Sequence, residues 1–96
     1  MIKHVVLFQF HDPEECIPTA REKLHSMVGK IPEICSMETG VDFWHGERSY
    51  DLCLIVTFKD RAGLEVYDTH PYHQEVRKYI YAHRKDSRIV DFEYDE

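Results

Sequence analysis

The residues best suited to chemistry lie in one short segment, residues 67–73, which reads YDTHPYH. It places two imidazoles and two phenols within seven residues. Imidazole changes its charge closest to neutral pH among the side chains, so it is the usual proton carrier of general acid–base sites. The composition of this segment therefore predicts a site at which protons are moved.

Pro71 breaks the backbone between the two histidines. The residue before a proline is pushed out of the α region, so His70 should end one helix. Pro71 suits the first position of the next helix, because its missing N–H is not needed there. His73, Val76 and Ile80 then share one face of the new helix. An imidazole on this apolar stripe points toward the core or a pocket.

The three strongest catalytic candidates are His73, Tyr67 and His4. His73 would be a neutral general base that removes a proton from a carbon beside a carbonyl; such a base typically contributes 10²–10⁴-fold in rate. Its structural alternative is a core histidine whose nitrogens are satisfied by the backbone or by Tyr67. Tyr67 would orient His73 or a substrate carbonyl, or would simply be a buried tyrosine with a hydrogen-bond partner. His4 shares strand parity with Val6 and Phe8, and lies either across the pocket from His73 or at the pocket rim.

Further residues are candidates for contact with a ligand. The simpler interpretation of His70 is structural, namely hydrogen bonding across the helix break. Arg48 would hold an anionic group, or would form a surface ion pair with Glu47 or with an acid of a partner chain. The apolar candidates for the wall of the pocket are Val6, Phe8, Leu54 and Ile80. A metal site built from His4, His70 and His73 is the less favoured alternative, because zinc needs three or four converging protein ligands.

Length and charge limit the possible partners. The 96 residues make one domain, residues 1–96, with a modest core that oligomerisation would supplement. The net charge is −6 and the basic residues are scattered among acidic ones, which argues against nucleic acid and anionic membranes. No apolar run approaches the roughly 18 residues of a membrane span, and no signal-peptide pattern is present, so we expect a soluble cytoplasmic protein.

The three cysteines, Cys16, Cys35 and Cys53, form no metal-binding or disulfide pattern. Cys35 and Cys53 lie in strand-like runs and are most simply small core residues. No neighbour would lower a thiol pKa, so a catalytic cysteine is not expected.

The order of elements follows from the apolar periodicity. Strands are expected over Ile2–Phe10, Ile34–Trp44, Tyr50–Phe58 and Ser87–Tyr94, and helices over Ile17–Ile31, from the Asp60 cap through Tyr67, and from Pro71 to about His83. This order is β-α-β-β-α-β, because the last two helices are one stretch broken at His70 and Pro71. It predicts an α+β, ferredoxin-like protomer with a four-stranded antiparallel sheet and the helices on one face.

The central strands are apolar on both faces. Val5 and Leu7 oppose Val6 and Phe8 on the first strand, and the third strand is equally apolar. A strand with one solvated face should alternate between apolar and polar residues. Two helices cover only one face of the sheet, and large bare apolar patches mark interfaces. The pattern predicts a homodimer packed sheet against sheet about a twofold axis.

Four motifs in register resemble the stress-responsive α/β-barrel domain family of dimeric α+β barrel proteins. They are MIKHVVLF at residues 1–8, ERSYDL at 47–52, HPYH at 70–73 and VDF at 90–92. The resemblance runs from end to end. It implies a ferredoxin-like protomer whose sheet pairs with that of a partner to form a barrel-like dimer.

The resemblance also implies a chemistry. A plant member of the family is a polyketide cyclase, in which a histidine base assisted by a tyrosine catalyses an intramolecular aldol condensation. The matching positions here are His73 and Tyr67, with a further histidine at His4. The helix that lines the cyclase's alkyl tunnel with aromatic residues carries Leu24 and Met27 here, which argues against a long-tailed polyketide substrate. Fold similarity alone does not fix chemistry.

Two functional hypotheses follow. In the first, a pocket between sheet and helices binds or converts a carbonyl-bearing, mostly apolar small molecule by aldol- or cyclase-type proton transfer, with His73 as base and no cofactor. In the second, the protein is a non-catalytic stress-response or ligand-binding dimer whose histidines are structural. Haem or oxygen chemistry is known from related dimeric barrels, but the sequence carries no haem signature.

Overall fold

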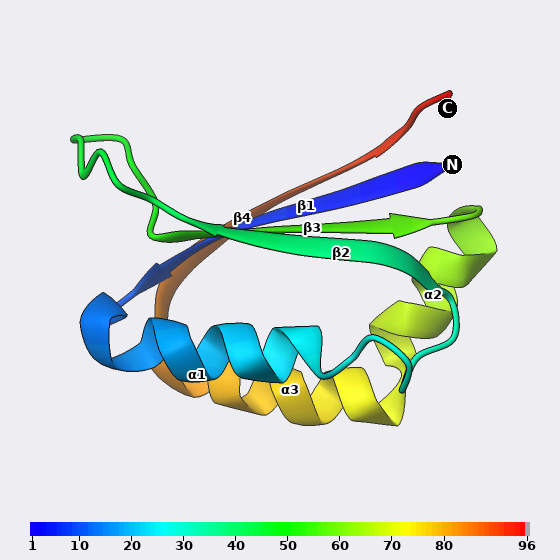
Figure 1. Ribbon diagram of the computed structural model, residues 1–96, viewed down its shortest axis with the longest axis horizontal. Coiled ribbons are helices and arrows are strands. Elements are labelled where there is room, and N and C mark those ends of the chain that lie inside the picture. The colour runs from blue at the N-terminus through cyan, green and yellow to red at the C-terminus, as the bar shows by residue number, and fades with distance from the viewer. Residues whose placement is uncertain (96) are drawn as a thin grey trace.

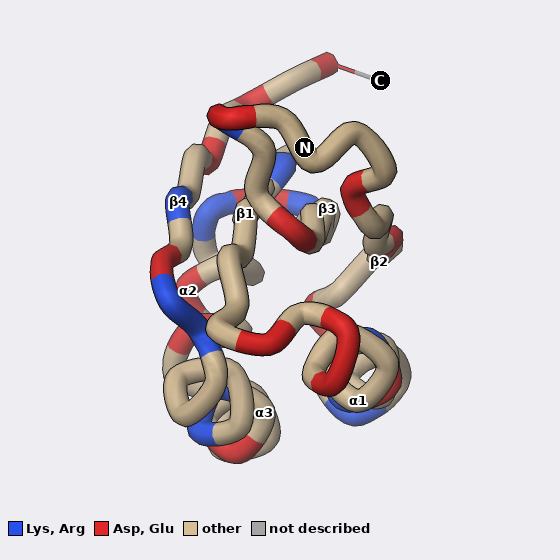
Figure 2. The backbone as a smooth tube through the Cα atoms, turned by 90° about the vertical axis from the view of Figure 1, so that its left-hand side faces the viewer, with Lys and Arg blue, Asp and Glu red and all other residues tan. Residues whose placement is uncertain are grey.

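The computed structural model describes residues 1–95 and contains seven elements. They are β1 (Ile2–Phe10), α1 (Pro13–His25), β2 (Ile34–Val41), β3 (Leu52–Phe58), α2 (Arg61–Thr69), α3 (Pro71–His83) and β4 (Arg84–Glu93). The strands form one antiparallel sheet in the order β2-β3-β1-β4. α1 and α3 lie side by side beneath this sheet, and α2 closes one end (Figures 1 and 2). The predicted ferredoxin-like α+β fold is confirmed.

Local side-chain chemistry sets where the helices begin. The side chains of Asp12 and Asp60 accept backbone N–H groups at the starts of α1 and α2, which satisfies donors that have no partner within the helix. His70 has extended backbone angles, ends α2 and caps α3, and Pro71 follows as the first residue of α3. The predicted helix break is therefore confirmed.

The first helix is shorter than its apolar period predicts, because α1 ends at His25 and not at Ile31. The N–H of Met27 donates to the carbonyl of Leu24 at 3.1 Å, a tighter pattern that closes the helix. Gly29 then adopts a φ of +87°, outside the helical region. Met27 and Ile31 are fully buried, so their apolar spacing reflects the packing of the turn after α1.

The second strand also ends early, at Val41 instead of Trp44. Phe43 and Trp44 are 86% and 77% exposed in the connection to β3. The side chain of Asp42 accepts the N–H of His45 at 2.7 Å, and this local turn competes with continued strand pairing.

The remaining boundaries differ by a few residues. β3 begins at Leu52 instead of Tyr50, and β4 begins at Arg84 instead of Ser87, directly after α3. The predicted end of α3 at His83 is confirmed. No helix within residues 1–95 is long and apolar enough to cross a membrane.

The cysteines are not all core residues. Cys16 is buried and Cys53 is half-buried, but Cys35 is exposed, so its prediction as a core residue is wrong. The pairing register of β2 shifts between Ile34 and Ser36. The extra residue at this irregularity is Cys35, which turns its side chain away from the core.

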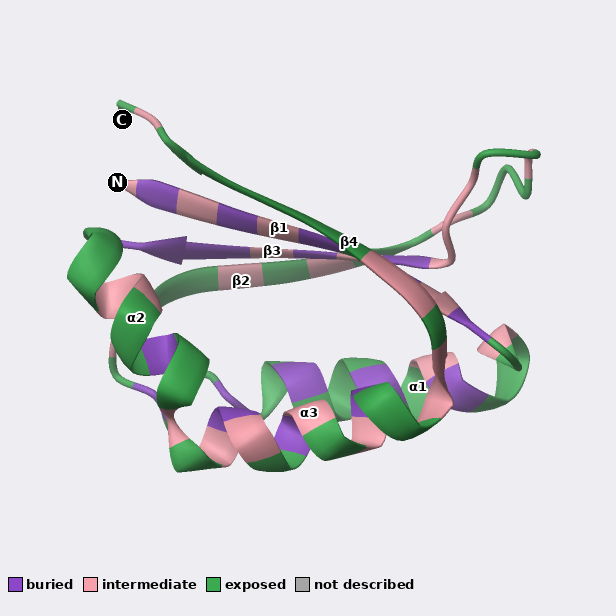
Figure 3. Cartoon of the chain, turned by 180° about the vertical axis from the view of Figure 1, so that it is seen from behind, coloured by how far each residue is buried: buried purple, intermediate pink, exposed green. Residues whose placement is uncertain are grey.

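The sheet separates two apolar faces. The inner face packs on the helices and carries the buried alternate residues of β1 and β3: Ile2, His4, Val6, Phe8 and Phe10, with Leu52, Leu54, Val56 and Phe58 (Figure 3). The outer face carries Val5, Leu7, Ile55, Val90 and Phe92, and no helix covers it. Leu7, Val90 and Phe92 are 38%, 54% and 43% exposed. The expected double-faced apolar strands are present.

Candidate functional site

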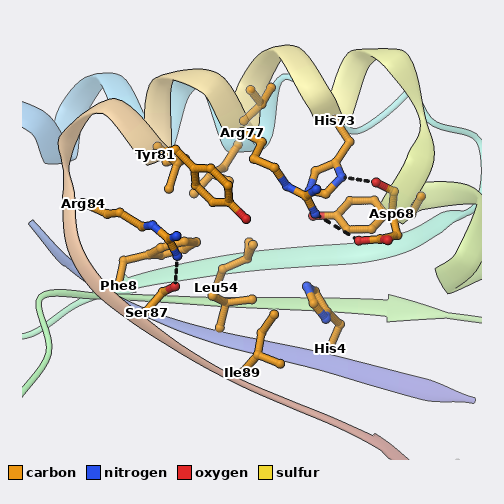
Figure 4. A pocket seen from close by; sticks show the side chains of 15 residues that line it. His4, Phe8, Leu54, Asp68, His73, Arg77, Tyr81, Arg84, Ser87 and Ile89 are labelled. Atoms are coloured by element: carbon orange, nitrogen blue, oxygen red, sulfur yellow. Dashed lines mark hydrogen bonds and ion pairs between the residues drawn. The ribbon is translucent and has the colours of Figure 1, made fainter.

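A cavity of about 90 Å³ lies between the inner face of the sheet and α3 (Figure 4). At the volume that one water needs, it has room for about six waters. Seven of the predicted site residues line it, namely His4, Val6, Phe8, Leu54, Tyr67, His73 and Ile80. The residues selected by strand alternation and those selected by helical spacing therefore line one cavity.

His73 projects into this cavity from the first turn of α3. Its Nδ1 lies 3.0 Å from the backbone carbonyl oxygen of Asp68. A carbonyl oxygen only accepts hydrogen bonds, so Nδ1 must carry the proton and donate. In the neutral ring Nε2 is then the unprotonated nitrogen, and it can accept a proton. The His73 side chain is buried, and its ring stacks on Tyr67 with centroids 4.2 Å apart.

The surroundings of His73 keep its imidazole neutral. Burial is the main cause that lowers the pKa of His73 from its ordinary value of 6.5. The charge of Arg77 and the proximity of His4 lower this pKa further, while the hydrogen bond and charge of Asp68 oppose the shift. The net result is a histidine that is an available base at neutral pH.

Tyr67 lies between the two histidines of the cavity. Its ring meets that of His4 edge-on with centroids 5.7 Å apart, and it is 2% exposed. Burial raises the pKa of Tyr67, so its hydroxyl stays protonated and can donate a hydrogen bond. Within residues 1–95 no fully buried side-chain polar atom lacks a partner, and no side-chain hydrogen bond involves Tyr67. Its hydroxyl therefore faces open space in the cavity.

His4 enters the cavity from β1 and is held by the neighbouring strand. Its Nδ1 lies 2.5 Å from a carboxylate oxygen of Asp91, its cross-strand neighbour on β4. The carboxylate fixes the orientation of the ring and keeps a proton on Nδ1, which leaves Nε2 for the cavity side. Asp91 belongs to the VDF motif, but the predicted strand pairing did not specify this contact.

A cationic group of residues at the cavity was missed from the sequence. Arg77 forms an ion pair with Asp68 at 3.0 Å. Arg84 donates to the hydroxyl of Ser87 at 2.5 Å, and its guanidinium lies 4.0 Å from the ring centroid of Tyr81. Arg77 is four residues after His73 on α3, and this spacing was a usable signal. Arg84 lies at the junction of α3 and β4, where no apolar period points to it.

Two predicted ligand-binding residues do not line the cavity. The Nδ1 of His70 accepts the N–H of Tyr72 at 3.1 Å, so this ring caps α3. Arg48 is exposed in the connection between β2 and β3. The structure does not bring either residue to the other candidates. Among residues 1–95, no three side chains of the metal-binding types converge, so His4, His70 and His73 do not form the metal site considered as an alternative.

Comparison with protein families gives one match across nearly the whole chain. The model of the stress responsive A/B barrel domain family matches residues 2–94. No curated protein sequence matches the chain.

Solved structures with the same fold come from bacteria and plants. A dimeric protein of unknown function and ferredoxin-like fold from Bacteroides fragilis is 25% identical, with a TM-score of 0.87 over 97% of this chain and 95% of that one. A protein of Arabidopsis thaliana is 21% identical, with a TM-score of 0.87 over 100% and 97% of the two chains. The hydroxynitrile lyase from Passiflora edulis is 14% identical, with a TM-score of 0.86 over 99% and 94%. The likeness to the two plant proteins shows the fold alone.

Proposed function

Because this chain belongs to the stress-responsive A/B barrel domain family, we propose that its cavity is a cofactor-independent proton-transfer site for a small carbonyl compound. His73 is the general base, Tyr67 is a hydrogen-bond donor to the carbonyl oxygen, and His4 orients the substrate through its Nε2. The mostly apolar wall suits a substrate whose body is hydrocarbon.

The proposed step begins at a carbon beside the carbonyl. Nε2 of His73 takes a proton from this carbon, and the C–H bonding pair moves to form the enolate, whose charge rests on the carbonyl oxygen. The hydroxyl of Tyr67 donates a hydrogen bond to this oxygen. The imidazolium of His73 then returns the proton, or the enolate carbon attacks a second carbonyl in an aldol-type reaction and the resulting alkoxide takes it.

One observation carries this proposal. The hydrogen bond from Nδ1 of His73 to the carbonyl of Asp68 leaves the basic nitrogen toward the cavity. The Passiflora edulis hydroxynitrile lyase supports the coarser point that a lyase can be built on this fold. It does not identify the substrate here, since fold does not determine chemistry.

We also propose that the working form is a homodimer. The outer face of the sheet carries exposed Leu7, Val90 and Phe92, and dimeric proteins of the same fold come from Bacteroides fragilis and other bacteria. Packing two outer faces together about a twofold axis would remove this apolar surface from water.

The alternative is a non-catalytic dimer that binds a small ligand or only completes its core. The observation that favours it is the same hydrogen bond, because a purely structural histidine would also satisfy one nitrogen with a backbone carbonyl. The cavity is also small, about 90 Å³. Under this alternative His73 contributes to stability and not to rate.

Exchange of deuterium into hexan-2-one in D₂O tests proton transfer directly, because it needs only abstraction and return at the carbon beside the carbonyl. The test variant is His73→Asn, whose amide N–H can still donate to Asp68 while the basic nitrogen is lost. We expect the protein-catalysed exchange rate, followed by NMR, to fall by about 10²–10⁴-fold. His83→Asn is the matched control, because His83 lies on the same helix beside Tyr79 and does not line the cavity. Equal rates in wild type and His73→Asn would overturn the proposal and favour the non-catalytic alternative.

A further inference from the structure

We propose that the ligand of this cavity is a short keto acid, whose carboxylate binds the guanidinium of Arg84 and whose ketone lies beside His73. This proposal rests on the proposed function, since it assigns the substrate class of the same site. Three features support it, namely the geometry of Arg84, the local charges and the spacing between the two ends of the cavity.

Arg84 is held in place before any ligand binds. Its guanidinium lies against the face of Tyr81, 4.0 Å from the ring centroid, and one of its nitrogens donates to the hydroxyl of Ser87 at 2.5 Å. A guanidinium carries five N–H donors in a rigid fork that matches a carboxylate. The contact with Ser87 uses one nitrogen, so the fork retains donors for an anion. Because stacking limits its rotation, less entropy is lost when the anion binds.

The charges around the cavity leave Arg84 without an acidic partner. Arg77, the other arginine of the cavity, is paired with Asp68. Within residues 1–95 no carboxylate lies within ion-pair distance of Arg84. Asp86 is close enough for Arg84 to contribute to its lowered pKa, but it is bonded by Tyr50 and Arg88.

This positive surplus is unusual for the molecule as a whole. The chain has a net charge of −6, yet the adjacent cations Arg84 and Lys85 lie where α3 passes into β4 (Figure 2). The lining contains one acidic residue, Asp68, and two arginines, Arg77 and Arg84. Because Arg77 is paired with Asp68, Arg84 is the cation of the lining that is left for an anionic ligand.

The two reactive ends of the cavity face each other across an apolar floor. Figure 4 shows Arg84 and Tyr81 at one end, His73 at the other, and Leu54 and Ile89 between them. A ligand that reaches both ends would hold its charge at Arg84 and its ketone at the base. Its middle would be hydrocarbon where it lies on Leu54 and Ile89, since these two side chains offer no hydrogen bonds.

Strand register gives a rough span for such a ligand, from the level of Ser87, which Arg84 contacts, to that of His4, whose ring contacts Tyr67 as that of His73 does. Ser87 pairs with Phe8, and Asp91 pairs with His4, so these levels are four residues apart along β4. Four residues of strand rise about 13 Å. Allowing about 3 Å for a hydrogen bond at each end leaves about 7 Å, which is roughly the reach of a six-carbon chain. We therefore take 5-oxohexanoate as the probe, because it has the ketone of hexan-2-one with a carboxylate in place of the terminal methyl group.

The experiment compares the affinity of the wild-type protein for 5-oxohexanoate and for its uncharged isostere 5-oxohexanamide, by titration followed with NMR. We expect the acid to bind about tenfold to a hundredfold more tightly, as hydrogen bonds to a charged group allow. Arg84→Gln should remove this preference. Lys85→Gln should retain it, because Lys85 is the adjacent exposed cation and does not line the cavity. Arg84→Lys should keep only part of it, since a lysine cannot bind a carboxylate as a fork.

Equal affinity for the acid and the amide, undetectable binding of the acid, or a preference that Arg84→Gln retains would each overturn the keto-acid proposal. These outcomes are separate from the test of proton transfer. If exchange into hexan-2-one depends on His73 but the protein binds the acid and the amide equally, the proposed function stands without the carboxylate site. Binding of the acid through Arg84 without any exchange would support the carboxylate site and reject catalysis.

Discussion

The two faces of the sheet are both apolar, but they differ in how far their side chains are exposed. On the inner face, Val56 and Leu54 are 0% and 1% exposed beneath the helices. On the outer face, Leu7 and Val90 are 38% and 54% exposed. The strands are similarly apolar on both sides, so what differs is the cover that the chain itself provides.

The single chain covers the inner face of its sheet and leaves the outer face to be covered in the proposed dimer. The inner face is covered by the helices, and the cavity of about 90 Å³ beside α3 holds the two histidines and Tyr67. The outer face leaves apolar residues such as Leu7 and Val90 partly exposed. The proposed chemistry and the proposed association thus lie on opposite sides of one layer.

The largest expected effect is the loss of stability when an inner-face residue of β3 is truncated, in comparison with an outer-face residue of the same strand. Leu52→Ala on the inner face should lower the free energy of unfolding by about 2–5 kcal/mol at any protein concentration, because it opens a hole in the monomer core. Ile55→Ala on the outer face should instead weaken the dimer, so its loss of stability should shrink as protein concentration rises. Urea titrations at two protein concentrations measure both. If Ile55→Ala costs the same at every concentration, the two faces do not differ in the proposed way.

A charge on the outer face should separate association from folding. Val90→Lys places a charge in the proposed interface, and we expect the dimer to weaken by about 2 kcal/mol, roughly thirtyfold in its dissociation constant. Monomer stability should change little, since Val90 is exposed in the single chain. Val66→Lys on α2 is the control, because Val66 is 44% exposed on a helix and is not part of the outer face of the sheet. Sedimentation that finds the same assembly for Val90→Lys and wild type would contradict an interface at this face.

Within the inner face, the comparison can be sharpened by removing one atom. Tyr67→Phe deletes a hydroxyl that makes no side-chain hydrogen bond in the protein but would bind a substrate oxygen. We expect deuterium exchange into hexan-2-one to slow by about tenfold, the worth of one hydrogen bond, with little change in melting temperature. A large fall in melting temperature with an unchanged exchange rate would assign this hydroxyl to structure.

The smallest expected effect is a dependence on pH that only the inner face should show. The pKa of His73 is lowered by burial, so the folded protein holds this histidine neutral below 6.5, where the unfolded chain already binds a proton. Stability from this residue is therefore complete above pH 6.5 and is lost as pH falls through the lowered pKa of the folded state. The exchange rate should fall with an apparent pKa below 6.5 for the same reason.

Urea unfolding is recorded above and below pH 6.5. The free energy of unfolding should depend less on pH in His73→Asn than in wild type, whereas the control His83→Asn should keep the wild-type dependence. An unchanged pH dependence of stability in His73→Asn would mean that another group titrates in this range.

Sequence periodicity was sufficient to predict the fold and the inner lining of the site. Val6, Phe8 and Leu54 reach the cavity by strand parity, and His73 and Ile80 reach it by helical spacing, because both rules concern residues that must face the core. The same rule failed at Ile31, which is buried although its helix has already ended. Apolar spacing reports burial, and burial does not require that the backbone remain helical.

The polar rim of the site was not predictable in the same way. Arg84 and Arg77 occupy positions that would be solvated on an isolated element, and they reach the cavity only through long side chains held by tertiary contacts. Arg48 was a candidate because a guanidinium can hold an anionic group, but it lies in an exposed connection. Cys35 was assigned to the core because a strand irregularity beside it leaves no mark in the residue types.

The acceptor that fixes the tautomer of His73 belongs to the main chain. The helix break at Pro71 frees the carbonyl of Asp68 at the end of α2, and His73 and the side chain of Gln74 both use it. Alanine scanning would miss this contact, because every replacement at position 68 keeps the same oxygen. Substitutions at position 68 therefore keep the acceptor that fixes the tautomer of His73. Insertions or deletions that join α2 and α3 into one helix would remove it.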